Sequence, residues 1–341
     1  TFIKSGEILF GFGLNARGQI GDGTTAAITE PILVFDREVK QVAVSGTHAM
    51  VVMTDCRLFA VGLNTHGQLG DGTVINKSEW IQVYASGIES VAVSQSNSYI
   101  VKSDNTLWAC GSLYGGRVGD GSSSSSTSKQ TTFVQILADV QNVYADGDAT
   151  HAVAVKLNGS LYGWGNNSAG QLADGTQGNY RLSPIQMVSS GVTSASVNQY
   201  NTMILNSDAT LSAVGGNYNG EFGDGTSGVA TSTIIPNIAQ DVAQISAGFK
   251  SSLLVKTDGS LHATGNNQFG QLGDGTNDNK TSWTEVESQD VAQVSCGKYQ
   301  TIILKTNNTF YTTGLNDSGQ LGDGTIINRN TFEQVITDGV S

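Results

Sequence analysis

The sequence has no uninterrupted apolar run of about 18 residues, so nothing in it predicts a membrane-spanning segment. Proline and cysteine each occur only three times among the 341 residues, and histidine four times. Cys56, Cys110 and Cys296 show no paired spacing, which argues against both a zinc site and a disulfide framework. We interpret the three cysteines as small buried side chains.

Charged side chains are also scarce, at 13% of the residues against about 25% in an average soluble domain. The 29 acidic and 17 basic residues give a net charge of −12. Such an acidic surface repels phosphate backbones, so a nucleic-acid partner is not predicted. Low charge together with many Ser, Thr, Asn and Gly residues favours an extracellular or cell-surface location. No helical periodicity is present either, which points to an all-β protein rich in turns.

Glycine is abundant, with 43 residues, and many of these belong to a phrase that recurs seven times. Its first copy runs from Gly13 to Thr24, and clear later copies are Gly62 to Thr73, Gly265 to Thr276 and Gly314 to Thr325. The aspartates of the repeated Gly-Asp-Gly step are Asp22, Asp71, Asp120, Asp174, Asp224, Asp274 and Asp323. Their separations are 49, 49, 54, 50, 50 and 49 residues, a period typical of repeat architectures.

A second phrase keeps step with the first and reads Asp258-Gly259-Ser260-Leu261 in its clearest copy. Asp-Gly between apolar runs predicts a tight hairpin turn. A short β-branched run precedes each turn, as at residues 50–53, and an alternating strand precedes that run, as at residues 42–44. A fourth strand follows the Gly-Asp-Gly-Thr phrase, as at residues 81–83. Four strands in each of seven repeats predict a seven-bladed β-propeller of four-stranded antiparallel blades.

The phrase from Gly265 to Thr276 resembles the hallmark of the RCC1 (regulator of chromosome condensation) repeat family, and the resemblance extends along essentially the whole chain. Members of that family bind other proteins through propeller loops, and some are exchange factors for the small GTPase Ran. The family's histidine before the buried strand is kept only at His48 and His151, where we expect structural hydrogen bonds. The aligned positions hold Asn97, Asn201, Ser251 and Gln300.

The repeat register predicts one domain over residues 1–341, in which the blade containing Thr1 to Lys4 lacks most of one strand. Val340-Ser341 reads as the start of a further strand, so we expect this domain to be a module of a longer chain. The longest repeat separation coincides with a serine-rich insertion at Ser122 to Ser128, for which we expect a protruding loop.

Motifs that carry catalysis are missing from the sequence: it has no zinc-protease, serine-hydrolase, Walker or EF-hand signature. Gly11-x-Gly13 matches part of a dinucleotide fingerprint but belongs to the first repeat, so no cofactor is predicted. We interpret Asp71, Asp274 and Asp323 as turn caps that bond backbone amides, because calcium repeats space their acids far more closely. His66 and His262 are expected to face solvent.

These observations favour a non-catalytic module or scaffold that binds a protein partner through loops on one face. The alternative is a guanine-nucleotide exchange factor for a small GTPase, and an enzyme acting on polysaccharide has no acid–base set to support it. No membrane insertion and no small-molecule substrate are predicted. The loop that enters the buried strand lies on the same rim in every blade. Its last three copies place aromatic and lysine side chains side by side as the predicted partner-binding residues: Tyr200, Phe249, Lys250, Lys298 and Tyr299.

Overall fold

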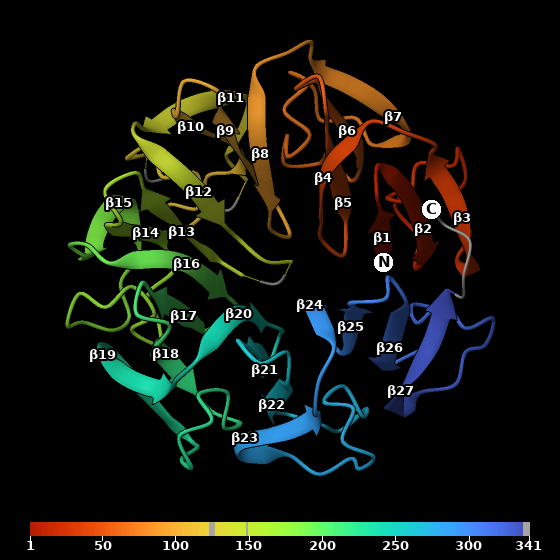
Figure 1. Ribbon diagram of the computed structural model, residues 1–341. Coiled ribbons are helices and arrows are strands. Elements are labelled where there is room, and N and C mark those ends of the chain that lie inside the picture. The colour runs from red at the N-terminus through yellow and green to blue at the C-terminus, as the bar shows by residue number, and fades with distance from the viewer. Residues whose placement is uncertain (123–126, 148, 337–341) are drawn as a thin grey trace.

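The computed structural model describes residues 1–122, 127–147 and 149–336, which form a ring of seven antiparallel sheets around a central axis (Figure 1). Each sheet is one blade, and its strands follow one another in chain order from the axis to the rim. Within these described ranges, six blades have four strands and the first blade has three. No helix occurs in the described part of the chain. The prediction of an all-β, seven-bladed propeller is therefore confirmed.

The strands have the following bounds. Blade 1 holds β1 (Phe2–Ser5), β2 (Ile8–Gly13) and β3 (Ile28–Phe35). Blade 2 holds β4 (Val39–Val44), β5 (His48–Met53), β6 (Leu58–Gly62) and β7 (Lys77–Tyr84). Blade 3 holds β8 (Ile88–Val93), β9 (Asn97–Lys102), β10 (Leu107–Ser112) and β11 (Lys129–Leu137). Blade 4 holds β12 (Val140–Tyr144), β13 (His151–Lys156), β14 (Leu161–Gly165) and β15 (Arg181–Val188). Blade 5 holds β16 (Val192–Val197), β17 (Asn201–Asn206), β18 (Leu211–Asn217) and β19 (Val229–Ala239). Blade 6 holds β20 (Val242–Ala247), β21 (Ser251–Lys256), β22 (Leu261–Gly265) and β23 (Lys280–Glu287). Blade 7 holds β24 (Val291–Cys296), β25 (Gln300–Lys305), β26 (Phe310–Gly314) and β27 (Arg329–Ile336).

Among the described residues, the blade that contains the N-terminal residues has three strands instead of four, as the repeat register predicts. Its β1 pairs with β2 in the way that β5 pairs with β6, so β1 takes the second place in the blade. The innermost place, which β4 takes in blade 2, is not occupied by any described residue of blade 1.

The core lies between neighbouring blades. The second strands of blades 2 to 6 are buried along most of their length, and all six residues of β5 are buried. Met50 and Leu58 of blade 2 pack against Val91 and Ile100 of blade 3 in one cluster, and similar clusters recur around the ring. Burying a side chain of this size stabilises a fold by about 1.5–3 kcal/mol. The short β-branched runs of the sequence therefore form the interfaces that hold the ring together.

The innermost strands of neighbouring blades are joined by side chains as well as by packing. The amide Nε2 of Gln41 donates to the carbonyl of Val91 at 3.0 Å, while its Oε1 accepts from the Val91 backbone N–H, also at 3.0 Å. Gln244 bonds Val294 in the same two-way manner, with both distances at 3.1 Å. These glutamines therefore satisfy backbone groups that no strand pairing reaches.

The repeated glycines allow the loop of one blade to contact the outer strand of the next. Gly270 has a φ of +80°, and a Cβ there would lie 2.4 Å from the Cα of Asn330 in blade 7. Both the left-handed backbone and the close approach require glycine at this position. The repeated Gly in the phrase is thus explained by the docking of adjacent blades.

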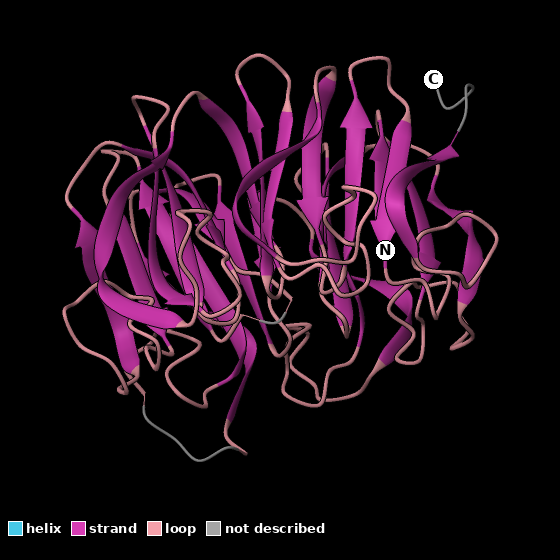
Figure 2. Ribbon diagram, turned by 90° about the horizontal axis from the view of Figure 1, so that it is seen from below, coloured by secondary structure: helices cyan, strands magenta, loops and turns pink. Residues whose placement is uncertain are grey.

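The loops at the two ends of the strands form two opposite faces of the ring, seen from the side in Figure 2. Because the strands are antiparallel, the connection between the first and second strands and the connection between the third and fourth strands emerge on the same face. We call this the loop face. The tight turns between the second and third strands, such as the one at Asp258-Gly259, lie on the opposite face.

Candidate functional site

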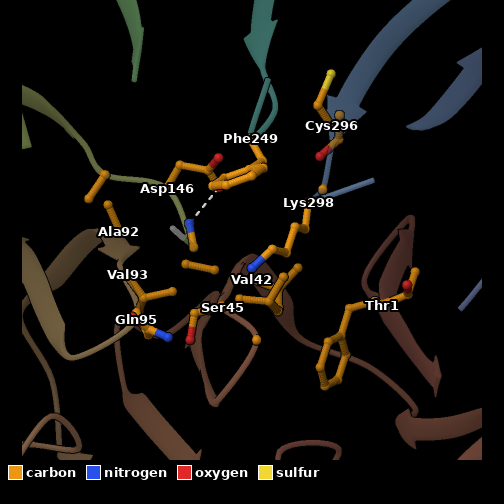
Figure 3. A pocket seen from close by; sticks show the side chains of 18 of the residues that line it. Thr1, Val42, Ser45, Ala92, Val93, Gln95, Asp146, Phe249, Cys296 and Lys298 are labelled. Atoms are coloured by element: carbon orange, nitrogen blue, oxygen red, sulfur yellow. Dashed lines mark hydrogen bonds between the residues drawn. The ribbon is translucent and has the colours of Figure 1, made fainter. Parts of the chain in front are cut away.

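A channel of about 920 Å³ lies where the innermost strands converge. Its wall includes Val42 of β4, Val93 of β8 and Ser196 of β16, together with residues of the loops that follow these strands. Figure 3 shows Phe249 and Lys298 entering the channel from one side, and Val42 and Ser45 lying on the other. The channel mouth is therefore built partly from the residues that the sequence selects as partner-binding.

Three of the five predicted partner-binding residues, Phe249, Lys298 and Tyr299, line the channel, and a fourth, Lys250, contacts the Phe249 ring. The ring centroids of Phe249 and Tyr299 are 5.6 Å apart in an edge-to-face arrangement. The Nζ of Lys298 lies 4.9 Å from the Phe249 centroid and 5.9 Å from that of Tyr299. The Nζ of Lys250 lies 5.3 Å from the Phe249 centroid. Both ammonium groups are thus placed at cation–π distance from the rings.

Tyr200, the fifth predicted residue, belongs to a different ring pair. Its centroid lies 5.5 Å from that of Tyr218 in an edge-to-face contact. Within the described ranges, no ring contact joins this pair to Phe249 or Tyr299. Tyr200, Phe249 and Tyr299 are all half-buried, so each ring presents part of its surface to solvent. The structure thus places the five residues on one face but in two groups.

Two aromatic residues of the loop face were missed by the sequence reasoning. Phe269 lies 5.0 Å from Tyr299, centroid to centroid, and extends the group formed by Phe249 and Tyr299. Tyr218 is 45% exposed and completes the pair with Tyr200. Both belong to the connection between third and fourth strands, which shares a face with the shorter connection. Aligning both loops of each repeat would have found them. We call Phe249, Lys250, Phe269, Lys298 and Tyr299 the Phe249 cluster.

Two of the four histidines, His48 and His151, form hydrogen bonds between neighbouring blades. The Nε2 of His48 lies 2.8 Å from Ser98 Oγ, and the Nε2 of His151 lies 2.9 Å from Thr202 Oγ1. Burial lowers the pKa of both histidines to about 3, so both rings are neutral near pH 7. The expected structural hydrogen bonds are confirmed. His66 and His262 are half-buried, whereas from the sequence both are expected to face solvent.

The cysteines differ from one another in burial. Cys110 and Cys296 are buried, as expected, whereas Cys56 is only half-buried and has a φ of 67° in a turn. Cys296 lines the channel, and its Sγ donates to the Ser246 carbonyl at 3.3 Å. Burial raises the pKa of this thiol to about 12, so the reactive thiolate is not available near pH 7.

The repeated aspartates are turn caps. The Oδ1 of Asp71 and of Asp274 each accepts a backbone N–H two residues later at 2.9 Å, and Asp323 does so at 3.0 Å. A buried asparagine also donates to each carboxylate, as Asn64 does to Asp71 at 2.9 Å. The cap interpretation is confirmed, and the asparagine explains a second constant residue of the phrase. No group of His, Cys, Asp or Glu that could hold a metal ion occurs among the described residues.

Two further sequence expectations concern the serine-rich insertion and membrane-spanning segments. Residues 123–126, the centre of the serine-rich insertion, lie outside the described residues. No helix of the described chain is long and apolar enough to cross a membrane.

Two models of one family match the sequence. A model described as the regulator of chromosome condensation (RCC1) repeat matches residues 8–52, 158–205 and 258–304. A second model with the same description matches residues 242–271 and 291–320. Together they cover just over half of the chain. No curated protein sequence matches the chain significantly.

Solved structures share the fold at low sequence identity. Prp20p from Saccharomyces cerevisiae has a TM-score of 0.85 at 17% identity, covering 98% of this chain and 87% of that chain. Human WBSCR16 has a TM-score of 0.84 at 17% identity, covering 98% and 94%. Yeast RCC1 (Prp20) bound to Kap60 has a TM-score of 0.84 at 16% identity, covering 98% and 85%. At these identities the likeness establishes the fold alone.

Proposed function

Because the chain belongs to the RCC1 repeat family, we propose that it is a non-catalytic module that binds a protein partner through its loop face. The observation that carries this proposal is the Phe249 cluster, which gathers three rings and two lysines from two neighbouring blades. Aromatic side chains are enriched at the centres of protein interfaces, where they act as anchors. Propeller loops around such anchors vary freely because the blades hold them in place.

The geometry of the cluster suits an anchor site. Phe249 and Tyr299 are half-buried, so each is held by its blade while part of its ring remains accessible. The two lysines beside them place ammonium groups within 5.3 Å of the Phe249 ring centroid. Rings fixed by edge-to-face contacts lose little conformational entropy when a partner docks. Tyr200 and Tyr218, on the same face, provide a second aromatic contact.

The exchange-factor alternative rests on the family alone. The structure of Prp20p was described with that protein's binding to Gsp1p and histones, but 17% identity carries no partner across. Measuring release of a fluorescent GDP analogue from small GTPases of the native source would test this alternative directly.

The proposal is tested by capturing partners from the native source with the full chain as bait. Wild type is compared with Phe249→Ala, Tyr200→Ala and, as a control, Leu33→Ala. Leu33 is 56% exposed on outer strand β3, away from the loop face. If Phe249 and Tyr200 are anchors, each substitution should weaken binding of the captured partner by about 2 kcal/mol or more, while the melting temperature of the protein changes little. Equal capture by all four proteins would place the binding site elsewhere.

A further inference from the structure

A second group of side chains on the loop face is distinct from the Phe249 cluster. It comprises His66 of the β6–β7 loop, Tyr114 and Arg117 of the β10–β11 loop, Lys129 at the start of β11, and Tyr180 just before β15. We call these five residues the Arg117 patch. They come from blades 2, 3 and 4, whereas the Phe249 cluster comes from blades 6 and 7.

Docking between blades brings the members of the patch together. The backbone at Gly67, next to His66, approaches β11 so closely that a Cβ there would lie 2.7 Å from Thr131 Cα. The backbone at Gly115, next to Tyr114, approaches the Tyr180 ring, which a Cβ would meet at 2.8 Å. The Tyr114 and Tyr180 centroids are 5.8 Å apart in an edge-to-face contact. The positions are therefore fixed by the same contacts that build the ring.

Arg117 departs from the repeat. The aligned position holds Gln68 in blade 2 and Gln171 in blade 4, whose Oε1 atoms accept backbone N–H groups within their own loops. The Arg117 guanidinium instead lies 5.6 Å from the Tyr114 centroid. It makes no hydrogen bond or ion pair with any residue that the structure describes. A planar guanidinium has five donors and pairs best with carboxylates, so this half-buried side chain presents unused donors at the surface.

The charge around Arg117 is positive. Lys129 is exposed and likewise forms no ion pair within the described ranges. Burial first, and then the charges of Arg117 and Lys129, lower the pKa of His66. The nearest acidic residue in the sequence, Asp120, accepts hydrogen bonds from the backbone and hydroxyl of Ser122. On a protein of net charge −12, these two cations make the Arg117 patch locally positive.

The two tyrosines add a flat surface beside these cations. Tyr114 is 39% exposed and Tyr180 is 46% exposed, and both rings belong to one pair. Exposed tyrosines next to an arginine form the kind of surface that protein interfaces use. Carboxylates complement the cations, and an apolar or aromatic side chain complements the rings.

From this arrangement we propose that the Arg117 patch binds an acidic segment of the protein partner, in which glutamate or aspartate side chains alternate with an aromatic residue. This inference rests on the proposed function and names the chemistry of the partner. The carboxylates pair with the Arg117 guanidinium and the Lys129 ammonium, and the aromatic side chain packs on Tyr114 and Tyr180.

The test uses synthetic probes, so that it does not depend on finding the native partner. Fluorescein-labelled peptides of the sequence (Glu-Glu-Phe)₄, (Gln-Gln-Phe)₄ and (Lys-Lys-Phe)₄ are titrated with the full chain, and anisotropy is measured at low and at physiological salt. We expect the acidic peptide alone to bind, with affinity that falls as salt rises. Equal binding of the neutral peptide would overturn the proposal, because the charges would then contribute nothing.

The variants restore residues that the repeat itself uses elsewhere. Arg117→Gln introduces glutamine, which the aligned positions 68 and 171 hold. Lys129→Asn introduces asparagine, which the aligned position 76 holds. We expect about tenfold weaker binding of the acidic peptide from Arg117→Gln and about threefold from Lys129→Asn. Lys256→Gln, at the end of β21 on the opposite face, is the control and should bind as wild type does. Wild-type binding by Arg117→Gln would overturn the proposal.

The experiment also separates this inference from the proposed function. If Phe249→Ala abolishes capture of the native partner while Arg117→Gln leaves acidic-peptide binding intact, only the Arg117 patch is refuted. If the peptide requires Arg117 but no native protein depends on Phe249 or Tyr200, the Phe249 cluster is refuted and the anion-binding patch stands.

Discussion

The Nε2 of His48 lies 2.8 Å from the Oγ of Ser98, which places a hydrogen bond between the second strands of blades 2 and 3. The Ser98 hydroxyl donates to the carbonyl of Gln68 at 2.7 Å, so it accepts from His48 and the imidazole carries its proton on Nε2. His151 and Thr202 repeat the arrangement between blades 4 and 5, and Thr202 Oγ1 donates to the Gln171 carbonyl at 2.9 Å. Two of the blade interfaces therefore depend on a neutral histidine.

Acid should destabilise the propeller through these two residues. Burial lowers the pKa of His48 and His151 to about 3, whereas the unfolded chain takes up the same protons near pH 6.5. The stability contribution is therefore full above about pH 6.5 and is lost as the pH falls from there towards about 3. Each histidine should steepen the fall by up to about 1.4 kcal/mol per pH unit. Urea unfolding at a series of pH values from 8 to 4.5 measures this slope.

Replacing both histidines provides the control for this prediction. Asn occupies the aligned positions Asn97 and Asn201, so His48→Asn with His151→Asn should fold. We expect the double variant to lose stability less steeply between pH 6.5 and 4.5 than wild type does. A slope as steep as that of wild type would show that other groups cause the acid sensitivity.

Removing one repeat carboxylate should destabilise the fold without affecting binding. Burial alone would raise the pKa of Asp274, but the hydrogen bonds from Lys280, Thr276 and Asn267 outweigh it and hold the pKa below its ordinary value. Asp274→Ala removes the cap of the Thr276 N–H and the ion pair with Lys280 at 3.0 Å. We expect a loss of about 0.5–2 kcal/mol in chemical unfolding.

Asp278 provides the matched comparison, because it is exposed in the same loop. Asp278→Ala should change the free energy of unfolding by less than about 0.5 kcal/mol. Melting of wild type should also be insensitive to a chelator. A chelator-dependent melting temperature would contradict the interpretation of these aspartates as turn caps.

The sequence predicts the ring well and its surface poorly, for a physical reason. The period of the aspartates and the buried runs such as β5 determine blade number and strand order, because the fold needs the same residues in every copy. Even the absence of an innermost strand among the described residues of blade 1 follows from the register of residues 1–4. The contacts between aromatic side chains of the loop face cannot be predicted in this way. Whether Tyr200 meets Phe249 or Tyr218 depends on side chains of two different loops, and no repeat constrains them.

Arg117 illustrates the same limit. Its position is occupied by glutamine in most copies. The repeat therefore indicates which residue the loop requires, but it does not predict what an arginine does there. Only the structure shows that the guanidinium leaves the loop's own hydrogen bonds and lies by Tyr114. Departures from a repeat are thus the places where sequence reasoning should look for binding.

Ala173 is another departure, and here we expect a cost in stability. Ala173 has a φ of 55° at a position where the other copies hold glycine, as at Gly70 and Gly273. A left-handed backbone costs a non-glycine residue about 1–2 kcal/mol, of which the greater flexibility of unfolded glycine offsets part. Ala173→Gly should therefore stabilise the protein by about 0.5–1 kcal/mol in chemical unfolding. Ala169→Gly, in the same loop but without positive φ, should destabilise it.

Glu221 provides the last prediction, because a carboxylate stands where most copies have glutamine. Its side chain is buried, with 2% of its surface exposed, and it accepts from the Asn219 backbone N–H at 2.7 Å and from Asn219 Nδ2 at 2.8 Å. Burial raises the pKa of Glu221 above its ordinary value, although these hydrogen bonds and the charge of Lys250 act in the opposite direction. The folded state therefore holds this proton more tightly than the unfolded chain does, and stability falls as the pH rises through 4.5 towards the folded-state pKa.

It follows that the ionised Glu221 destabilises the fold at pH 8, and that Glu221→Gln should remove this cost. The amide keeps the acceptor that Gln171 and Gln271 provide to their own loops, at 2.9 and 3.0 Å. We expect the variant to be more stable than wild type by about 0.5–2 kcal/mol at pH 8. The gain should shrink as the pH falls through the folded-state pKa of Glu221 towards 4.5, and should be lost below that pH. Glu79→Gln, at an exposed position of β7, should show no such gain. If Glu221→Gln is less stable than wild type at pH 8, the attraction between the carboxylate and Lys250 outweighs the cost of burial, and Glu221 holds the Phe249 cluster in place.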